Sequence, residues 1–296
     1  MTTMYTIPLV AKKSPSPFRF PTFYTLYNKH FPKTNAPSQS FLEWFVGFTE
    51  GNGSFKFNSR GIAIFVISLD QQVLEYIQRT LGFGRINKQG LRRLRRPCTS
   101  CFIVEELASV ALLVALFNGN MVLPIKQSSF ALFLKAFNKR SRRSQDVGFI
   151  PSLVSPTIYD FWLSGITDAD GCFNCSLLGN SKAYRIRFFL GELLGEGEDN
   201  LTVLKHITTL IGGVVRTHSN PGRHELIING VRNVERILKY FETHPLYTQK
   251  AKSYQLWREV QASLLKGEHL SPASRAVLKS QAASINKKNE CTTQRE

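Results

Sequence analysis

The sequence predicts an α+β protein built from two similar halves, each with an antiparallel sheet that helices cover on one face. First, the phrase FVGFTEGNGSF at residues 45–55 returns as LSGITDADGCF at residues 163–173. Second, the residues after each phrase alternate between polar and aromatic side chains, which is typical of a strand with one buried face. Third, the later helices and strands recur in the same order, which indicates an internal duplication.

The repeated phrase predicts a helix with a stripe of small residues. Gly47 and Gly51 lie one turn apart in the first copy, and Gly165 and Ala169 have the same spacing in the second. Small residues four apart let two helix backbones approach closely. We therefore expect the two helices to pack against each other about a pseudo-twofold axis.

Each of these helices is expected to end at a glycine C-cap, Gly53 or Gly171, that turns the chain into a strand. Asn52 and Asp170 come directly before, so they are expected side by side at the bottom of the helix pair. Two carboxylates there would repel each other, and a divalent cation would offset the repulsion. Metal between acids can activate water for phosphodiester hydrolysis. The alternative is a packing seam in which Asp170 only caps its helix.

The strands after each phrase predict a polar outward face. In the first half this face carries Ser54, Lys56, Asn58 and Arg60, with Phe55 and Phe57 opposite. In the second half it carries Cys172, Asn174, Ser176 and Asn180, followed on the next strand by Arg185 and Arg187. Further along come Arg85, Asn87 and Lys88, and then Arg216 and His218. Such side chains suit phosphates and base edges, although a solvated sheet face also alternates.

The net charge favours a polyanion as the partner. Lys and Arg number 38 against 21 Asp and Glu, a balance of +17. A basic run at a predicted hairpin tip is expected to anchor phosphates or to be a solvated loop, and its cations are Arg92, Arg93, Arg95 and Arg96. An ordinary basic protein is the alternative, and a hydrophobic content of 43% argues against wholesale disorder.

The remaining segments repeat with loops of different length. Residues 73–84 match 203–214 as a helix closed by glycine, and 102–120 match 226–244 as a strand that runs into a helix. Residues 123–137 match 246–260, which aligns Lys126 with Lys250. Each half therefore predicts helix, strand, strand, helix, strand, strand, helix, helix. The expected divisions are an N-terminal extension (1–38), a first half (39–137), a linker (138–156), a second half (157–268), and a surface helix with a polar tail (269–296).

Several classes of protein are excluded or left open. The most apolar run, residues 110–117, is far shorter than the ~20 residues of a membrane-spanning helix, so we expect no membrane partner. Two C-x-x-C pairs, Cys98/Cys101 and Cys172/Cys175, fall in predicted strands, where i and i+3 point to opposite faces and cannot share zinc. Residues 1–38 lack acids, which fits a transit peptide, a disordered arm or the remnant of an upstream reading frame.

The paired phrases resemble the signature helices of single-chain LAGLIDADG homing endonucleases, an intron- and intein-associated family, over about residues 40–268. This resemblance implies two pseudosymmetric αββαββα halves in a monomer, forming a saddle of antiparallel sheets that grips a long DNA site. It also implies Mg²⁺ held by the last acid of each motif. By that correspondence Asp170 and Asn52 are the metal-binding and catalytic positions, and Lys126 and Lys250 are similar to the supporting lysines.

The chain departs from the family pattern at its active site. Asn52 replaces an acid, so it can offer a neutral oxygen but no charge, and it cannot act as a base. Glu50 and Asp168 lie two residues earlier, about 200° around the helix, and cannot replace the lost acid. The polar pair that the family presents at the end of the second strand is replaced by Leu69 and Asp70, and by Gly191 and Glu192.

Three functions are consistent with the sequence. The first is a working or nicking Mg²⁺-dependent DNA endonuclease, and the second is a non-cleaving RNA-binding maturase of a group I intron. The third is a structural component of a ribonucleoprotein. All three bind double-stranded DNA or structured RNA, and the lost acid favours a protein whose double-strand cleavage is impaired or absent. We expect an organellar protein, with the mitochondrion favoured over the chloroplast.

Overall fold

The computed structural model describes residues 17–58, 60–88, 100–141, 145–179, 181–191, 198–217 and 224–286. The first half contains α2 (Gln39–Asn52), β1 (Gly53–Phe57), β2 (Ala63–Leu69), α3 (Gln71–Leu81), β3 (Arg85–Lys88), β4 (Ser100–Val104), α4 (Leu107–Phe117) and α5 (Pro124–Ser141). The second contains α6 (Trp162–Asp170), β5 (Cys172–Leu177), β6 (Tyr184–Leu190), α7 (Glu198–Ile211), β7 (Val214–Thr217), β8 (His224–Asn229), α8 (Glu235–Thr243) and α9 (Lys250–Leu265). The predicted order of elements is confirmed in both halves.

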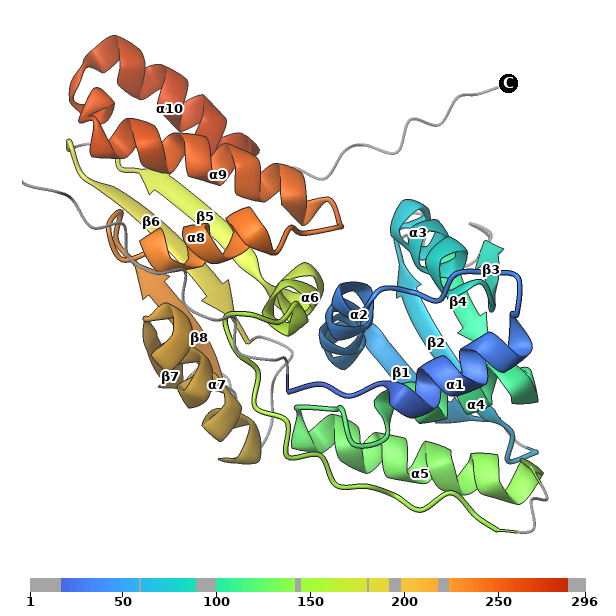
Figure 1. The fold of residues 1–296 in the computed structure, drawn as a ribbon. Helices are drawn as coiled ribbons and strands as arrows, with labels where there is room; N and C mark the ends of the chain where they lie inside the picture. The colour runs from blue at the N-terminus through green and yellow to red at the C-terminus, as the bar shows by residue number, and fades with distance from the viewer. Residues whose placement is uncertain are drawn as a thin grey trace, which may run out of the picture.

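The two sheets share one topology. Their strand orders are β1-β2-β4-β3 and β5-β6-β8-β7, and every pairing is antiparallel. In Figure 1 the sheets lie on either side of the central pair α2 and α6. The α+β class and the duplicated architecture predicted from the sequence are therefore confirmed.

One face of each sheet is buried beneath helices, as the alternation predicts. Phe55 packs against Phe130 and Phe133 of α5 in the first half, and Phe173 packs against Phe241 and Trp257 of α8 and α9 in the second. Large aromatic side chains bury much apolar surface per residue, so these contacts fix the helices on the sheets.

The expectation for Phe57 is wrong. Its side chain is 59% exposed, although it belongs to the same face as Phe55. It is the last residue of β1, and the chain turns back after it, where Asn58 N donates to the carbonyl oxygen of Ile62.

The segments that flank the halves differ from the sequence expectations. Residues 17–38 include a helix, α1 (Pro21–His30), which contacts α4 and buries Phe23 and Tyr27, so this part of the extension is not a disordered arm. Helix α5 continues to Ser141, into the predicted linker. Residues 1–16 lie outside the described part of the chain.

The last elements described are a short 3-10 turn (Glu268–Leu270) and α10 (Pro272–Ser284). Ser271 is the N-cap and Pro272 follows it, but the Ser271 side chain makes no capping hydrogen bond. Helix α10 is more than a surface helix, because Leu278 and Ala282 are buried and it packs against β5 and α9. No helix in the described residues is both long and apolar enough to cross a membrane.

Candidate functional site

The centre of the molecule is the contact between α2 and α6, where glycines allow backbone to meet backbone. A Cβ atom on Gly47 would overlap the carbonyl oxygen of Trp162, and one on Gly165 would overlap that of Trp44. Farther along, a Cβ on Gly51 would overlap the Cβ of Ala169. The contacts at Gly47 and Gly165 correspond to each other between the halves, so the predicted pseudo-twofold helix pair is present.

Two tryptophan–acid hydrogen bonds cross this interface with the same symmetry. The indole Nε1 of Trp162 donates to Glu50 Oε2 over 2.5 Å, and that of Trp44 donates to Asp168 Oδ2 over 2.9 Å. Each acid also accepts a backbone hydrogen bond from just before its own half's last helix, from Leu123 N (2.6 Å) and from Tyr247 N (2.7 Å). Burial raises the pKa of Glu50 to about 7 and also raises that of Asp168.

These bonds show the role of Glu50 and Asp168, the acids two residues before Asn52 and Asp170. Glu50 and Asp168 are buried, and each is held by a tryptophan of the partner helix and by the backbone of its own half. They lock the helix pair to the helical layers of both halves. Neither is available to replace the acid missing at position 52.

The ends of both helices also depend on glycine, for a reason other than the one expected. Gly53 and Gly171 follow the helices with extended backbones (φ −80° and −71°), so neither is a left-handed cap. A Cβ on either glycine would lie 2.5 Å from the Cγ2 atom of Thr49 or Thr167. Glycine is needed here because the strand leaves the helix so closely.

Asn52 and Asp170 are the last helical residues, directly after the close contact between Gly51 and Ala169. Both are partly buried, and both come directly after the residues through which the two helices meet at this end. The side-chain nitrogen Nδ2 of Asn52 is buried and has no hydrogen-bond partner within the described residues. An amide donor without an acceptor stands where the second half has a carboxylate.

Each half also brings its aligned lysine to the end of its helix. Lys126 Nζ donates to the carbonyl oxygen of Gly53 over 2.8 Å, and Lys250 Nζ donates to that of Thr167 over 3.1 Å. Burial lowers the pKa of both lysines, and the charge of Glu50 opposes this at Lys126, as the charges of Asp168 and Asp170 do at Lys250. Lys250 therefore lies in the electrostatic field of Asp170, whereas Lys126 has an uncharged amide in the matching place.

The donor set can be tested against Mg²⁺, the ion that the resemblance implies. Asp170 supplies one carboxylate, and Asn52 could add only a neutral oxygen. No cluster of three or more His, Cys, Asp or Glu suited to a metal occurs among the described residues. These residues fit one cation held mainly by Asp170 and do not fit a pair of anionic ligands, one from each helix.

The outward face of the second sheet is strongly basic. Arg187 pairs across the sheet with Asn174 and Asn229, and Arg185 pairs with Ser176. The pKa of Arg187 is lowered by partial burial and by the neighbouring charges of Arg185 and Arg216, and the charge of Glu225 opposes this. Three guanidinium groups thus share a face with amide and hydroxyl side chains, as the alternation predicts, and with one acid, Glu225, which pairs across the sheet with Arg216.

The outward face of the first sheet is less basic and more apolar than predicted. Arg85 is ion-paired with Glu105 at 2.8 Å, and both side chains are about half exposed. The cross-strand row that includes Ser54 and Arg85 also contains Val66 and Ile103. Lys56 and Asn87 remain exposed on this face.

Two residues predicted on that face belong to a turn instead. Asn58 Oδ1 accepts hydrogen bonds from Arg60 N (2.9 Å) and Ile62 N (3.0 Å), so Asn58 closes the β1–β2 hairpin. Arg60 is exposed within this turn, beyond the end of β1. Asp70, at the end of β2, caps α3 by accepting from Gln72 N over 2.8 Å. The polar pair that the resemblance implies there is replaced by a structural cap.

Of the other predicted residues, the two cysteines of the second pair are described and several residues are not. In the second half Cys172 is exposed and Cys175 is buried, so they point to opposite faces. Cys98, Asn180, Glu192, His218 and the run with Arg92, Arg93, Arg95 and Arg96 lie outside the described residues, as does the side chain of Lys88.

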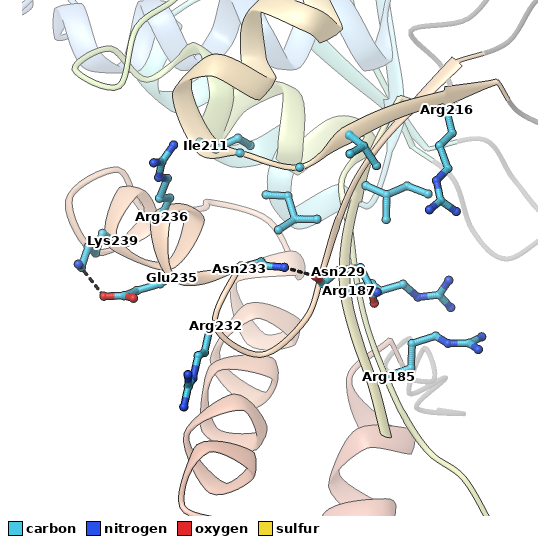
Figure 2. A pocket seen from close by; sticks show the side chains of 15 residues that line it. Arg185, Arg187, Ile211, Arg216, Asn229, Arg232, Asn233, Glu235, Arg236 and Lys239 are labelled. Carbon is cyan, nitrogen blue, oxygen red and sulfur yellow. Dashed lines mark hydrogen bonds and ion pairs between the residues drawn. The ribbon is translucent and has the colours of Figure 1, made fainter. Parts of the chain in front are cut away.

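The structure adds a group of cations that the sequence reasoning missed. Arg232, Arg236 and Lys239 lie on α8 and just before it, and with Arg185, Arg187 and Arg216 they line a cavity of about 1040 Å³ (Figure 2). Arg236 and Lys239 lie three residues apart on α8, and Arg232 lies in the turn before it, so the signal in the sequence was a run of cations at a spacing of four and then three residues.

Comparison with known proteins places these features in context. A family model described as LAGLIDADG endonuclease matches residues 45–137 and 163–261. A Neurospora crassa protein named probable intron-encoded endonuclease 4 is 31% identical over 254 residues, which cover 83% of this chain and 44% of that protein. An uncharacterized cox1 intron-2 protein of Schizosaccharomyces pombe is 22% identical over 84% of this chain and 75% of its own length.

Solved structures show the same fold. The meganuclease I-SmaMI bound to uncleaveable DNA superposes with a TM-score of 0.68 at 18% identity, covering 85% of this chain and all of that one. The homing endonuclease I-LtrWI bound to target DNA also gives 0.68, at 17% identity, with coverage of 84% and 99%. The duplicated architecture derived above is that of these meganucleases.

Proposed function

Because this chain belongs to the LAGLIDADG endonuclease family, we propose that it is a nucleic-acid-binding protein that holds duplex DNA on its two sheets and whose double-strand cleavage is impaired or lost. The observation that carries the proposal is the unequal pair at the end of the central helices, with Asp170 on one side and Asn52 on the other. Phosphodiester cleavage of both strands needs charge at both positions, and only one of them supplies it.

Binding is supported by the basic outward face of the second sheet. Arg185, Arg187 and Arg216 can neutralise phosphates, and Asn174 can pair with base edges. The I-SmaMI and I-LtrWI structures with the same fold are complexes with DNA. The chain spans 44% of the length of its Neurospora relative, so an activity that depends on further domains is not implied.

The remaining chemistry belongs to the second half. Mg²⁺ beside Asp170 would supply Lewis-acid stabilisation of charge on the phosphate. Burial lowers the pKa of Lys250, as it does that of Lys126, so either Nζ exchanges a proton more readily than an exposed lysine, but only Lys250 lies in the field of a carboxylate at the end of its central helix, Asp170. In the first half Lys126 faces no carboxylate from position 52, so a strand that depends on that side would be cut slowly or not at all. Nicking of one strand is therefore the second candidate.

The names of the relatives favour an intron origin. The two relatives described above are named as products of introns, one of them in cox1. We propose that this protein is likewise intron-encoded, in an organelle, and specifically a mitochondrion. An RNA-binding role in splicing is a further candidate, because the same basic surfaces would hold RNA phosphates.

The experiment is a binding measurement with the full chain and a duplex that spans the uninterrupted insertion site. Arg185→Ala/Arg187→Ala should weaken duplex binding by about tenfold or more, and it should flatten the salt dependence by about 0.9 for each phosphate that is no longer neutralised. The control is Arg79→Ala/Lys139→Ala, which removes the same charge from exposed positions on α3 and α5.

Equal weakening by the control would refute a role for the sheet face, and undetectable duplex binding at about 0.1 M salt would refute duplex recognition. Tighter binding to the intron transcript at matched salt, together with faster splicing, would favour the RNA role instead.

A further inference from the structure

We infer that the cavity at the free end of the second sheet is a separate binding site for a single strand of nucleic acid, held by its phosphodiester backbone. The cavity is formed where β7 begins, because β8 continues past the first residue of β7. Val214 pairs with Ile227, and Asn229 of β8 pairs only with β6. This leaves a notch at the sheet edge, lined by six Arg and Lys side chains and a single acid, Glu235.

The cations in the notch form two groups that point away from each other. In Figure 2, Arg185, Arg187 and Arg216 project from one side of the strands, whereas Arg236 and Lys239 project from the other. The first group belongs to the outward sheet face already assigned to the duplex. The second, which we call the α8 cluster, consists of Arg232, Arg236 and Lys239.

The contacts of the α8 cluster within the described residues do not explain why three cations lie there. Lys239 is paired with Glu235 at 2.7 Å on the helix surface. Arg232 and Arg236 are exposed, and neither guanidinium makes a hydrogen bond or ion pair with any described residue. Arg232 precedes α8 and points away from Arg236 in Figure 2, so each guanidinium presents a separate unneutralised charge that a phosphate can neutralise.

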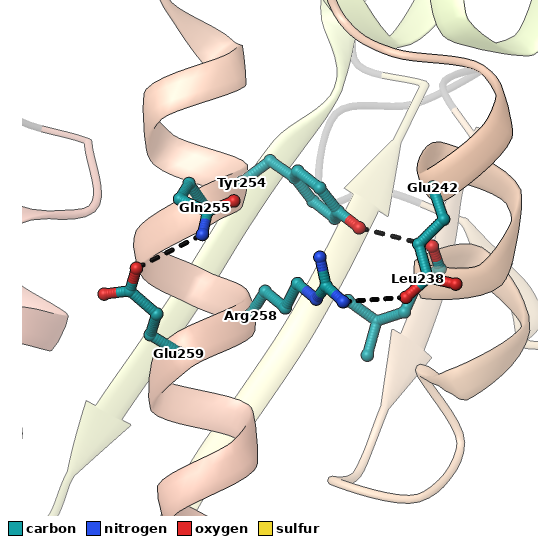
Figure 3. A network of polar contacts seen from close by, with 6 residues as sticks. All are labelled: Leu238, Glu242, Tyr254, Gln255, Arg258 and Glu259. Carbon is teal, nitrogen blue, oxygen red and sulfur yellow. Dashed lines mark hydrogen bonds and ion pairs between the residues drawn. The ribbon is translucent and has the colours of Figure 1, made fainter.

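The helix that carries Arg236 and Lys239, α8, is held in place by its neighbours. Tyr254 Oη donates to the Leu238 carbonyl over 3.2 Å, and Arg258 is ion-paired with Glu242 at 2.8 Å, so α8 is fixed to α9 (Figure 3). The opposite side of α8 is buried through Ile237 and Phe241. The cations are therefore presented at fixed positions, which lowers the entropy cost of binding.

The geometry favours a single strand over the duplex itself. Double-stranded DNA is stiff, with a persistence length of about 150 base pairs, so a duplex on the sheet face cannot bend around the sheet edge to reach the α8 cluster. A single strand is flexible and can follow a positive notch. No aromatic side chain lines the cavity among the described residues, so we expect contacts to phosphate without base stacking and hence little sequence preference.

The test uses the full chain with labelled strands of about 20 nucleotides, oligo-dT and oligo-rU, in the presence and absence of a saturating unlabelled duplex. Arg232→Ala/Arg236→Ala should weaken binding of a strand by about fivefold or more and change duplex affinity by less than about twofold. The matched control is again Arg79→Ala/Lys139→Ala, which should change neither. Equal affinity for the two strands supports recognition of the phosphate alone, and a preference for oligo-rU identifies RNA as the source.

Two results would overturn the inference. One is unchanged strand binding in Arg232→Ala/Arg236→Ala. The other is displacement of the strand by the duplex, with Arg185→Ala/Arg187→Ala and Arg232→Ala/Arg236→Ala weakening both ligands alike, because the notch would then be part of a single surface. Failure of the duplex proposal is seen separately, as an absence of duplex binding by the native protein, and it would leave the strand measurement intact.

Discussion

The two halves of this protein have the same fold but differ in chemistry. The contacts that build the helix pair are matched between the halves. Gly47 corresponds to Gly165, and the hydrogen bond from Trp162 to Glu50 corresponds to that from Trp44 to Asp168. The groups that would act on a ligand are not matched. Position 170 is an acid where position 52 is an amide, and the second sheet face carries three arginines where the first has an ion-paired Arg85.

This difference separates the residues that hold the fold from those that serve the site. A change in either helix glycine would damage both halves, since each packs against the backbone of the other. A change at position 52 or on a sheet face affects one half and leaves the fold intact. The asymmetry of the site can therefore arise without loss of stability.

The largest effect should come from filling the helix contact. Gly47→Val and Gly165→Val each place a side chain against a tryptophan carbonyl on the partner helix, and each should lower the free energy of unfolding by about 3 kcal/mol or more. Denaturant unfolding measures this. Gly148→Val is the control, because nothing lies within 4 Å of a Cβ there. A clear difference between the two helix variants would show that the interface is less symmetric than described.

The β hairpins should differ in their dependence on distant support. Arg275 of α10 donates to the carbonyls of Leu178 (2.7 Å), Ser181 (2.7 Å) and Ala183 (2.9 Å) in the β5–β6 hairpin. Asn58 closes the β1–β2 hairpin from within. Arg275→Ala should cost about 2 kcal/mol of unfolding free energy and Asn58→Ala about 1 kcal/mol.

The same unfolding experiment checks this pair, with hydrogen exchange of the hairpin amides as a local readout. Arg79→Ala, an exposed cation on α3, is the control. If Arg275→Ala leaves exchange in the β5–β6 hairpin unchanged, α10 does not hold that hairpin.

The two sheet faces should contribute unequally to duplex affinity. Arg187→Ala should weaken binding about tenfold, or about 1.4 kcal/mol, because its guanidinium lies among other cations on the face. Lys56→Ala should weaken it about threefold. Fluorescence anisotropy with one duplex at one salt concentration gives both values. Equal weakening by the two variants would contradict the prediction that the second sheet contributes more to duplex affinity than the first.

Stability should depend on pH through the start of α6. Asp160 is buried and accepts hydrogen bonds from Thr157 N (2.6 Å) and Trp162 N (3.1 Å), yet burial dominates and raises its pKa from 3.8 to about 7. The folded protein therefore holds this proton more tightly than the unfolded chain does. The stabilisation is complete below about pH 3.8 and is lost as the pH rises toward 7.

The measurement is the free energy of unfolding at several pH values between about 4.5 and 7.5. Asp160→Asn should flatten the decline by about 3 kcal/mol across this range, because each unit of pKa shift is worth about 1.4 kcal/mol. The first helix should contribute nothing of this kind at its start, because α2 is capped by the neutral Ser38, which accepts from Phe41 N. A profile that does not change in Asp160→Asn would show that Asp160 is ionised in the fold.

Most of the architecture could be predicted from the sequence because each element occurs twice and the two copies can be compared. The small-residue stripe placed the helix contact, and the polar–aromatic alternation placed the sheet faces. The segments outside the two halves had no second copy for comparison, so α1 and the packing of α10 were missed. Alternation also cannot show where a strand stops, which is why Phe57, Asn58 and Arg60 were wrongly assigned to a continuing strand.

The candidate site was predictable in its positions and less so in its partners. Asn52, Asp170, Lys126 and Lys250 could be found from the aligned motifs. The ion pair of Arg85 with Glu105 joins residues far apart in sequence, and only the folded chain brings them together. The same holds for the notch, where residues of β6, β7 and α8 meet.

The most direct test of the unequal site is cleavage of a duplex target whose two strands carry different labels, in Mg²⁺, by the native protein and Asn52→Asp. We expect the native protein to cut one strand at most at an appreciable rate. Asn52→Asp should gain cleavage of the other strand by about a hundredfold or more, and Asp170→Asn should cut neither. If the native protein instead cuts both strands as fast as Asn52→Asp, the missing carboxylate at position 52 has no catalytic consequence and the two halves are chemically equivalent after all.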